Sequence, residues 1–213
     1  MTEQRPGGVA VRVSALCLDR DGRLTDRLIF SDAVRAALLV DLVLAGRMTS
    51  TEDSIVVDAT PTGFPPADRL LAAIAAESER SLDEWLDERR IGLRDVVAEN
   101  VATGHWERRT GPFGLQARYT DHAPEQTARD LSRSIPDWPE DGSPEDACVT
   151  VVGAASGLLD REFGLPENPP PAVLAATGPA EWLCSTVVEH LRQVHVRYRE
   201  QAGALGAGIV GPF

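Results

Sequence analysis

The chain has 213 residues, a formal net charge of −12 and 43% hydrophobic residues. A chain of this length can bury a core without disulfides or metals, and its acidity opposes non-specific attraction to DNA and to anionic membranes. All 21 basic residues are arginine, a usage typical of a GC-rich bacterial genome. Any phosphate binding must come from a local group of these arginines, whose planar fork suits phosphate and carboxylate.

The N-terminal residues 1–8 are polar and contain Pro and Gly, so we expect them to be disordered, with no signal peptide. No apolar run approaches the ~18 residues needed to cross a bilayer. The three cysteines are far apart and indicate buried small residues in a reducing compartment. We therefore expect a cytoplasmic protein whose membrane contact, if present, is peripheral.

The first half of the chain predicts a strand, a central helix and a hairpin. Valines alternate with other residues over 9–18, which predicts a strand that ends at the turn 19–22. Ser31 and Asp32 begin a helix that runs to Ala45, and Gly46 ends it. This helix is apolar nearly all round, so it should be buried. A short hairpin over 47–57 follows.

The pattern of a helix, a glycine that ends it and a hairpin occurs a second time, between residues 58 and 119. After a turn-rich link at 58–63, a helix begins at Pro65. A capping-box pattern at 81–84 begins another, which continues to about Thr103 with a break or bend near Gly92. A second hairpin spans 105–119.

The C-terminal part predicts further helices. They cover residues 124–135, 145–163, 172–176 and 179–201, and the remaining residues 203–213 form a Gly-rich tail. The fold class is therefore mainly α: a helical core wrapped by amphipathic helices, with two short β-hairpins. We expect one domain over 9–202.

No catalytic or metal-binding pattern is present. Ser156 lies in a helical pattern without the GxSxG elbow of hydrolases. His190 and His195 are five residues apart on a helix, so they do not share a face. We expect no cofactor, no metal and no enzymatic activity.

Three arginines are candidates for an anion site. Arg35 is the one basic residue of the apolar helix and falls in its predicted first turn, where free backbone N–H groups also attract anions. A salt bridge to a neighbouring acid is the equally weighted alternative. Arg90 and Arg94 are four residues apart and would share one face of a continuous helix.

Several segments together resemble the Golgi phosphoprotein 3 family. They are the helix SDAVRAALLVDLVLAGRM at 31–48, the link DATPTG at 58–63, Leu70-Leu71, Trp85-Leu86 and the stretch 90–104 with its hairpin. The resemblance covers roughly residues 10–200 and indicates a bacterial member. It implies a mostly helical peripheral membrane protein that binds phosphatidylinositol 4-phosphate and acts as an adaptor for other proteins.

The resemblance also implies site residues. The family's headgroup pocket has a Trp before the first core helix, an Arg in it and two basic residues later. Arg35 and Arg90 match the first and the second of these arginines. The third basic position falls on Leu93, beside Arg94, and the Trp position falls on Asp26 or Arg27. We therefore expect Arg35, Arg90, Arg94 and Arg27 to bind an acidic phospholipid headgroup.

In this family the second hairpin contributes to self-association and can touch the membrane. The residues here that could make such a contact are Trp106, Arg109, Phe113 and Leu115, with Arg108 and Arg118 beside them. They predict a homo-oligomer or membrane contact through 105–119. Packing of Trp106 and Tyr119 onto the domain is the alternative for this hairpin. Two other functions stay open: a protein–protein scaffold without a lipid role, and a winged-helix DNA-binding regulator, which the acidic charge disfavours.

Overall fold

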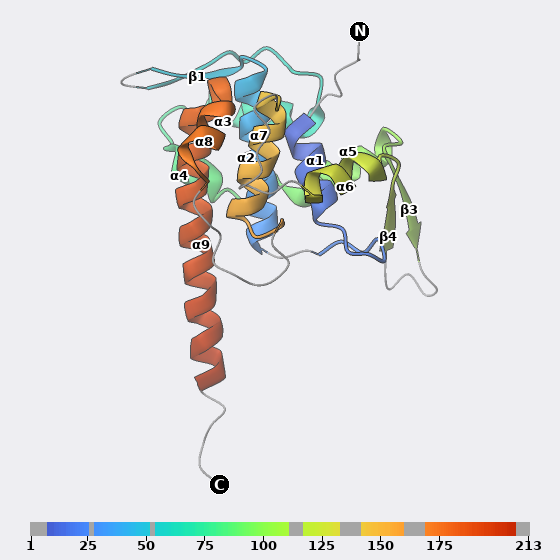
Figure 1. The fold of residues 1–213 in the computed structure, drawn as a ribbon. Coiled ribbons are helices and arrows are strands. Elements are labelled where there is room, and N and C mark those ends of the chain that lie inside the picture. The colour runs from blue at the N-terminus through green and yellow to red at the C-terminus, as the bar shows by residue number, and fades with distance from the viewer. Residues whose placement is uncertain are drawn as a thin grey trace.

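The computed structural model describes residues 8–25, 28–51, 54–110, 117–132, 142–159 and 169–207, the last ten as backbone only. It is mainly helical with two antiparallel hairpins, as the sequence predicts (Figure 1). The helices are α1 (Gly8–Leu16), α2 (Leu28–Leu44), α3 (Pro65–Ala76), α4 (Leu82–Leu86), α5 (Leu93–Ala102), α6 (Pro124–Ser132), α7 (Pro144–Ala155), α8 (Pro171–Ala176) and α9 (Glu181–Ala207). A 3₁₀ turn, η2 (Gly178–Ala180), precedes α9.

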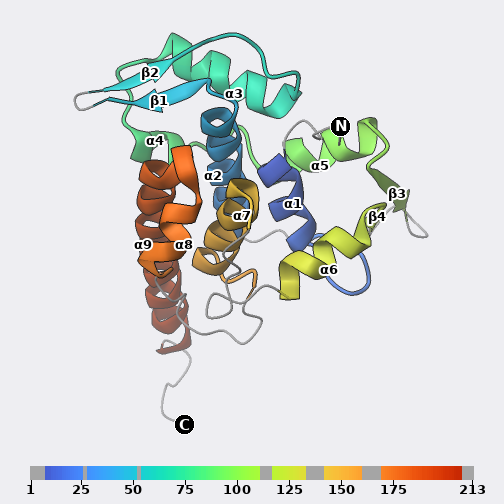
Figure 2. The same cartoon turned by 45° about the horizontal axis from the view of Figure 1, so that its top comes forward.

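Helix α2 is the centre of the fold. Leucine, alanine and valine occupy all sides of it, and its buried residues extend from Ile29 to Val43. Such a helix cannot be stable at a surface, so other helices must enclose it. α1, α3, α5, α7 and α9 all pack against it (Figure 2). The expected central, buried helix is confirmed, although it begins at Leu28 rather than at Ser31.

The segment predicted as a strand over 9–18 is a helix, α1. Its valines alternate, but the helix is buried on nearly every side, so neither helical nor strand periodicity distinguishes its faces. Tertiary contacts decide for the helix. Both carboxylate oxygens of Asp41 accept hydrogen bonds from the first backbone N–H groups of α1, those of Val9 and Ala10, at 2.9 Å.

A buried ion-pair network fixes the outer face of α1. Arg12 Nη2 lies 2.6 Å from Asp130 of α6 and 2.7 Å from Asp146 of α7. The carboxyl group of Asp130 is 1% exposed. Arg12 therefore joins α1 to two helices whose contacting residues lie 118 and 134 residues later in the sequence.

Both hairpins form where they are expected. Strands β1 (Met48–Ser50) and β2 (Ile55–Val57) pair with Met48 opposite Val57. Strands β3 (Trp106–Thr110) and β4 (Ala117–Asp121) pair with Arg109 opposite Arg118. Figure 2 shows the first hairpin above α2 and the second beside α5 and α6.

The loop after α1 docks on the second hairpin through Gly22. Tyr119 N donates to Gly22 O at 2.7 Å, and a Cβ atom on Gly22 would lie 2.4 Å from Tyr119 O. Gly22 also has φ +72°, which disfavours other residues. The loop and β4 are therefore in backbone contact.

The break or bend expected near Gly92 is a break, which separates α4 from α5. α4 has the predicted capping box, in which Ser81 and Glu84 bond each other's backbone N–H groups. It ends at Leu86, and segment 87–92 crosses to α5. A Cβ atom on Gly92 would lie 2.7 Å from Ser31 Oγ. The backbone at Gly92 therefore lies too close to α2 for a residue with a side chain, unless Ser31 shifts.

The C-terminal helices differ from the predicted ranges in length. α7 ends at Ala155, eight residues before the predicted end at 163. α9 continues to Ala207, past the predicted start of the tail at 203. In Figure 1 the end of α9 projects well beyond the helices around α2. Within the described residues, no helix is both long and apolar enough to cross a membrane.

Candidate functional site

Arg35 lies inside the protein, and not at the start of its helix. α2 begins at Leu28, which places Arg35 in the third turn and removes it from the free N–H groups that a first-turn position would share. The residue is 0% exposed. The expectation of an anion site formed by Arg35 and a helix N-terminus is therefore wrong in its geometry.

The guanidinium of Arg35 already has three acceptors. Nη1 lies 2.8 Å from Asp32 Oδ1, an ion pair within α2. Nη1 also donates to Leu86 O at 2.6 Å, and Nε donates to Ile91 O at 3.0 Å. The carboxylate of Asp32 neutralises the buried charge, and the two carbonyls belong to the segment between α4 and α5. Arg35 therefore fastens segment 86–91 to the central helix.

This fastened segment presents Arg90 to solvent. The side chain of Arg90 is 69% exposed and makes a bidentate contact with Glu88, with Nε–Oε1 and Nη2–Oε2 distances of 3.0 and 2.8 Å. Arg80 Nη1 lies 3.1 Å from the same carboxylate. Hydrogen bonds from Arg90 in particular hold the pKa of Glu88 well below its usual range. Glu88 therefore occupies the fork that a phosphate would use.

Arg94 is exposed in the first turn of α5, four residues after Arg90. The break at Gly92 separates the two, so they do not share the face of one continuous helix as expected. The first turn of α5 also has an internal anion: Asp95 Oδ2 accepts the Gly92 N–H at 3.0 Å, and Arg69 lies 2.6 Å from Asp95 Oδ1. The expected residues are thus neighbours along one ledge, residues 86–94, with Arg35 beneath and Arg90 and Arg94 on the outside.

Comparison with known protein families identifies the chain. The family model described as Golgi phosphoprotein 3 (GPP34) matches residues 14–195, most of the chain. The protein belongs to the Golgi phosphoprotein 3 family. The match includes Arg35, the ledge 86–94 and the second hairpin. A search of curated proteins found no match to the chain.

In this Golgi phosphoprotein 3 family member, the second hairpin buries its Trp instead of exposing it. Trp106 is 2% exposed, and its ring lies 5.8 Å from that of Tyr119, tilted by 55°. Trp106 is therefore a core residue here, which corrects its expected role in membrane or oligomer contact. Arg109 is exposed and pairs with Glu107 at 3.0 Å. Phe113 and Leu115 lie outside the described residues, as do Asp26 and Arg27.

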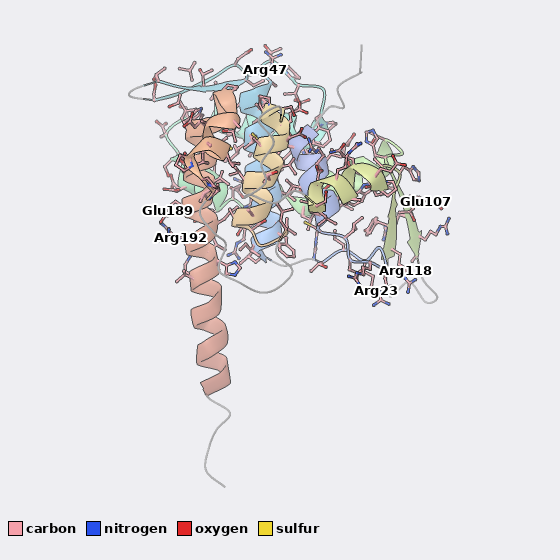
Figure 3. The ribbon with its side chains drawn as sticks, viewed as in Figure 1. Arg23, Arg47, Glu107, Arg118, Glu189 and Arg192 are labelled. Atoms are coloured by element: carbon pink, nitrogen blue, oxygen red, sulfur yellow. The ribbon has the colours of Figure 1, made fainter. Side chains whose placement is uncertain are left out.

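Sequence reasoning named Arg108 and Arg118 of this hairpin but missed that Arg20 and Arg23, in the loop after α1, lie beside it. Within the described part of the chain, Arg20, Arg23, Arg108 and Arg118 form no ion pair. Arg23 and Arg118 come together because the loop docks on β4 through Gly22 (Figure 3). Acidic neighbours alternate with them in sequence: Asp19, Asp21 and Glu107. The only earlier signal was the high share of arginine in the hairpin.

A second missed feature lies behind the ledge, on α9. His190 is 5% exposed, and its Nε2 has no hydrogen-bond partner among the described residues. Nε2 lies 3.8 Å from Asp87 Oδ1, and Arg197 Nη2 lies 3.9 Å from the same oxygen. Burial lowers the pKa of His190. In the described residues, no three His, Cys, Asp or Glu side chains are grouped to hold a metal ion.

Proposed function

We propose that this protein is a non-enzymatic adaptor that binds acidic phospholipid headgroups at the cytoplasmic face of a membrane. The observation that carries the proposal is the ledge 86–94, which a buried arginine holds in place and which exposes Arg89, Arg90 and Arg94. Membership of the Golgi phosphoprotein 3 family supports the same function.

The chemistry of the ledge suits a phosphate monoester or diester. The fork of Arg90 is preformed by its bidentate contact with Glu88, and a phosphate presents the same planar spacing of two oxygens. The headgroup replaces Glu88 at this fork, while Glu88 keeps Arg80 as its partner at 3.1 Å. In this exchange Arg35 is a positioning residue and Arg90 and Arg94 contact the lipid.

The electrostatic balance predicts weak and salt-sensitive attachment. The ledge has few arginines, and the net charge of −12 opposes approach to an anionic surface. A homo-oligomer through the hairpin 105–119 would multiply this attachment, because each added copy binds at high effective concentration. Self-association is therefore part of the proposal, together with a protein partner held at the membrane.

The test is sedimentation with phosphatidylcholine vesicles that contain phosphatidylglycerol, phosphatidylinositol or phosphatidylinositol 4-phosphate, at low and at physiological salt. We expect salt-sensitive binding that becomes about tenfold weaker in the Arg90→Ala/Arg94→Ala variant. Arg192→Ala is the matched control, because Arg192 is an exposed arginine of α9 paired with Glu189 (Figure 3).

Two outcomes would contradict the proposal. No binding to any acidic vesicle would remove the lipid function, and equal binding by the double variant and the control would remove the ledge as its site. Preference for phosphatidylinositol 4-phosphate over the other lipids would show that the family's specificity survives without a Trp at position 26 or 27.

A second candidate function, a protein–protein scaffold, is favoured by the arginines around the second hairpin. Asp19, Asp21 and Glu107 lie close in sequence to Arg20, Arg23 and Arg108, whereas Arg118 lies opposite Arg109. This surface therefore has mixed charge rather than a basic field. Mixed charge suits a protein partner better than an anionic membrane. Affinity capture from the host that is lost in Arg23→Ala/Arg118→Ala, with vesicle binding unchanged, would support it.

A DNA-binding role has no comparable support in the geometry. α5, the helix before the second hairpin, carries Arg94 as its one basic residue beside Asp95 and Glu99. A helix that enters a DNA groove needs a basic face for the phosphates on both sides. Absence of a mobility shift at low salt would remove this alternative.

A further inference from the structure

Two of the three cysteines face each other across a helix interface. Cys148 lies in α7 and Cys184 in α9, and both are 0% exposed. Their sulfur atoms are 3.9 Å apart, and the Cys184 thiol donates to Cys148 Sγ. The two helices pack against each other, so the contact joins two well-formed elements of the core.

The third cysteine shows that this contact is particular to the pair. Cys17 is also buried, but its thiol donates to Val13 O, four residues earlier, at 3.5 Å. Cys17 thus behaves as a small core residue with a local bond. The chain therefore contains both the candidate pair and an internal control.

We propose that Cys148 and Cys184 form a reversible intrachain disulfide that locks α9 to α7 when the protein meets a peroxide oxidant. One thiol loses its proton, and the thiolate attacks hydrogen peroxide, breaks the O–O bond and becomes sulfenic acid. The hydroxide that leaves takes up that proton and becomes water. The second sulfur then attacks the sulfenic sulfur, the S–S bond forms, and a second water leaves. Two thiols and one peroxide thus give one disulfide and two waters, and a dithiol reductant reverses the oxidation.

The geometry requires little movement to close the bond. The sulfurs must approach from 3.9 Å to about 2.05 Å for the bond to form. The close contact with the Cys184 thiol and burial in the core raise the pKa of Cys148, so its thiolate is scarce in the closed structure. The reaction therefore begins when α9 separates locally from α7 and the thiols meet water.

α9 is the element that such a lock would act on. It projects beyond the rest of the fold (Figure 1), and Asp87, the residue after α4, lies near its His190 and Arg197. A covalent bond at Cys184 would hold the first turn of α9 and suppress its separation. The bond closes a loop in which the cysteines are 36 residues apart. Such a loop raises the melting temperature by about 5–15 °C.

The experiment exposes the native full-length protein to hydrogen peroxide and follows its mass and its melting temperature. We expect a loss of two hydrogens per chain, a peptide pair linked at Cys148 and Cys184, a higher melting temperature, and reversal by dithiothreitol. Cys17→Ser should behave as the wild type, and Cys148→Ser and Cys184→Ser should each lose the mass change.

Two results would overturn the inference. One is a disulfide that forms in urea-unfolded protein but not in the native protein under the same peroxide. The other is a disulfide that forms in the native protein and lowers its melting temperature, which would mean that the bond strains the α7–α9 contact instead of locking it. Because vesicle binding is not the readout, failure of the lipid proposal would leave this test unaffected.

Discussion

Replacement of Arg35 by leucine should destabilise the protein strongly, because Arg35 is a buried structural residue. Its loss leaves the carboxylate of Asp32, 6% exposed, without a countercharge, and removes the donor to Leu86 O and Ile91 O. Breaking a buried ion pair costs about 3–5 kcal/mol, and each buried acceptor left without a donor costs about 1–3 kcal/mol. We therefore expect a loss of at least ~4 kcal/mol in the free energy of unfolding.

Urea denaturation followed by circular dichroism measures this loss, and thermal melting should show a fall of roughly 8 °C or more. Arg192→Leu, which changes an exposed arginine of α9, should alter stability little. Asp32→Asn combined with Arg35→Leu should recover about half of the loss, because it removes the unpaired charge but leaves the two carbonyls without donors.

A small effect would refute this reasoning. If the free energy of unfolding of Arg35→Leu stays within about 1 kcal/mol of the wild-type value, the guanidinium of Arg35 is hydrated and accessible to a phosphate. Its role would then be that of a headgroup ligand. If the variant is strongly destabilised yet its folded fraction still binds acidic vesicles, Arg35 acts only by positioning the ledge.

Further predictions concern titration and close packing. Burial raises the pKa of Asp41 to about 7, so the stabilisation by its protonated carboxyl group is present below pH 3.8 and is lost as pH rises through 7. Between pH 5 and pH 8, the free energy of unfolding of the wild type should therefore fall by about 2 kcal/mol relative to that of Asp41→Asn, as measured by urea titrations at each pH. The lowered pKa of His190 acts in the opposite sense, because its contribution to stability is present above pH 6.5 and is lost on acidification. NMR should find that His190 has a pKa below 6.5, the ordinary value of histidine, and an ordinary pKa would contradict its burial. Gly92→Ala should cost about 1–3 kcal/mol, since its Cβ would lie 2.7 Å from Ser31 Oγ, whereas an unchanged melting temperature would show that Ser31 moves aside without cost. Gly22→Ala should loosen the loop from β4, read as faster hydrogen exchange at the Tyr119 amide, and unchanged protection there would refute the docking.

Some features of this protein are local and follow from the sequence alone. The mostly apolar composition of residues 31–45 favours a buried central helix, and glycines at 46 and 104 end helices before the two hairpins. The capping box at Ser81 also forms as predicted. These signals depend on residues within one or two helical turns of each other, so contacts with the rest of the chain do not change them.

Other features depended on residues far apart in sequence, and only the tertiary structure decided them. Alternating valines in α1 predicted a strand, until the carboxylate of Asp41 supplied a helix cap from more than 30 residues away. Arg35 changed from an expected phosphate ligand to a buried anchor because carbonyls 51 and 56 residues later reach its guanidinium. Exposure of a charged side chain is set by what packs over it, and local sequence contains no information on that packing.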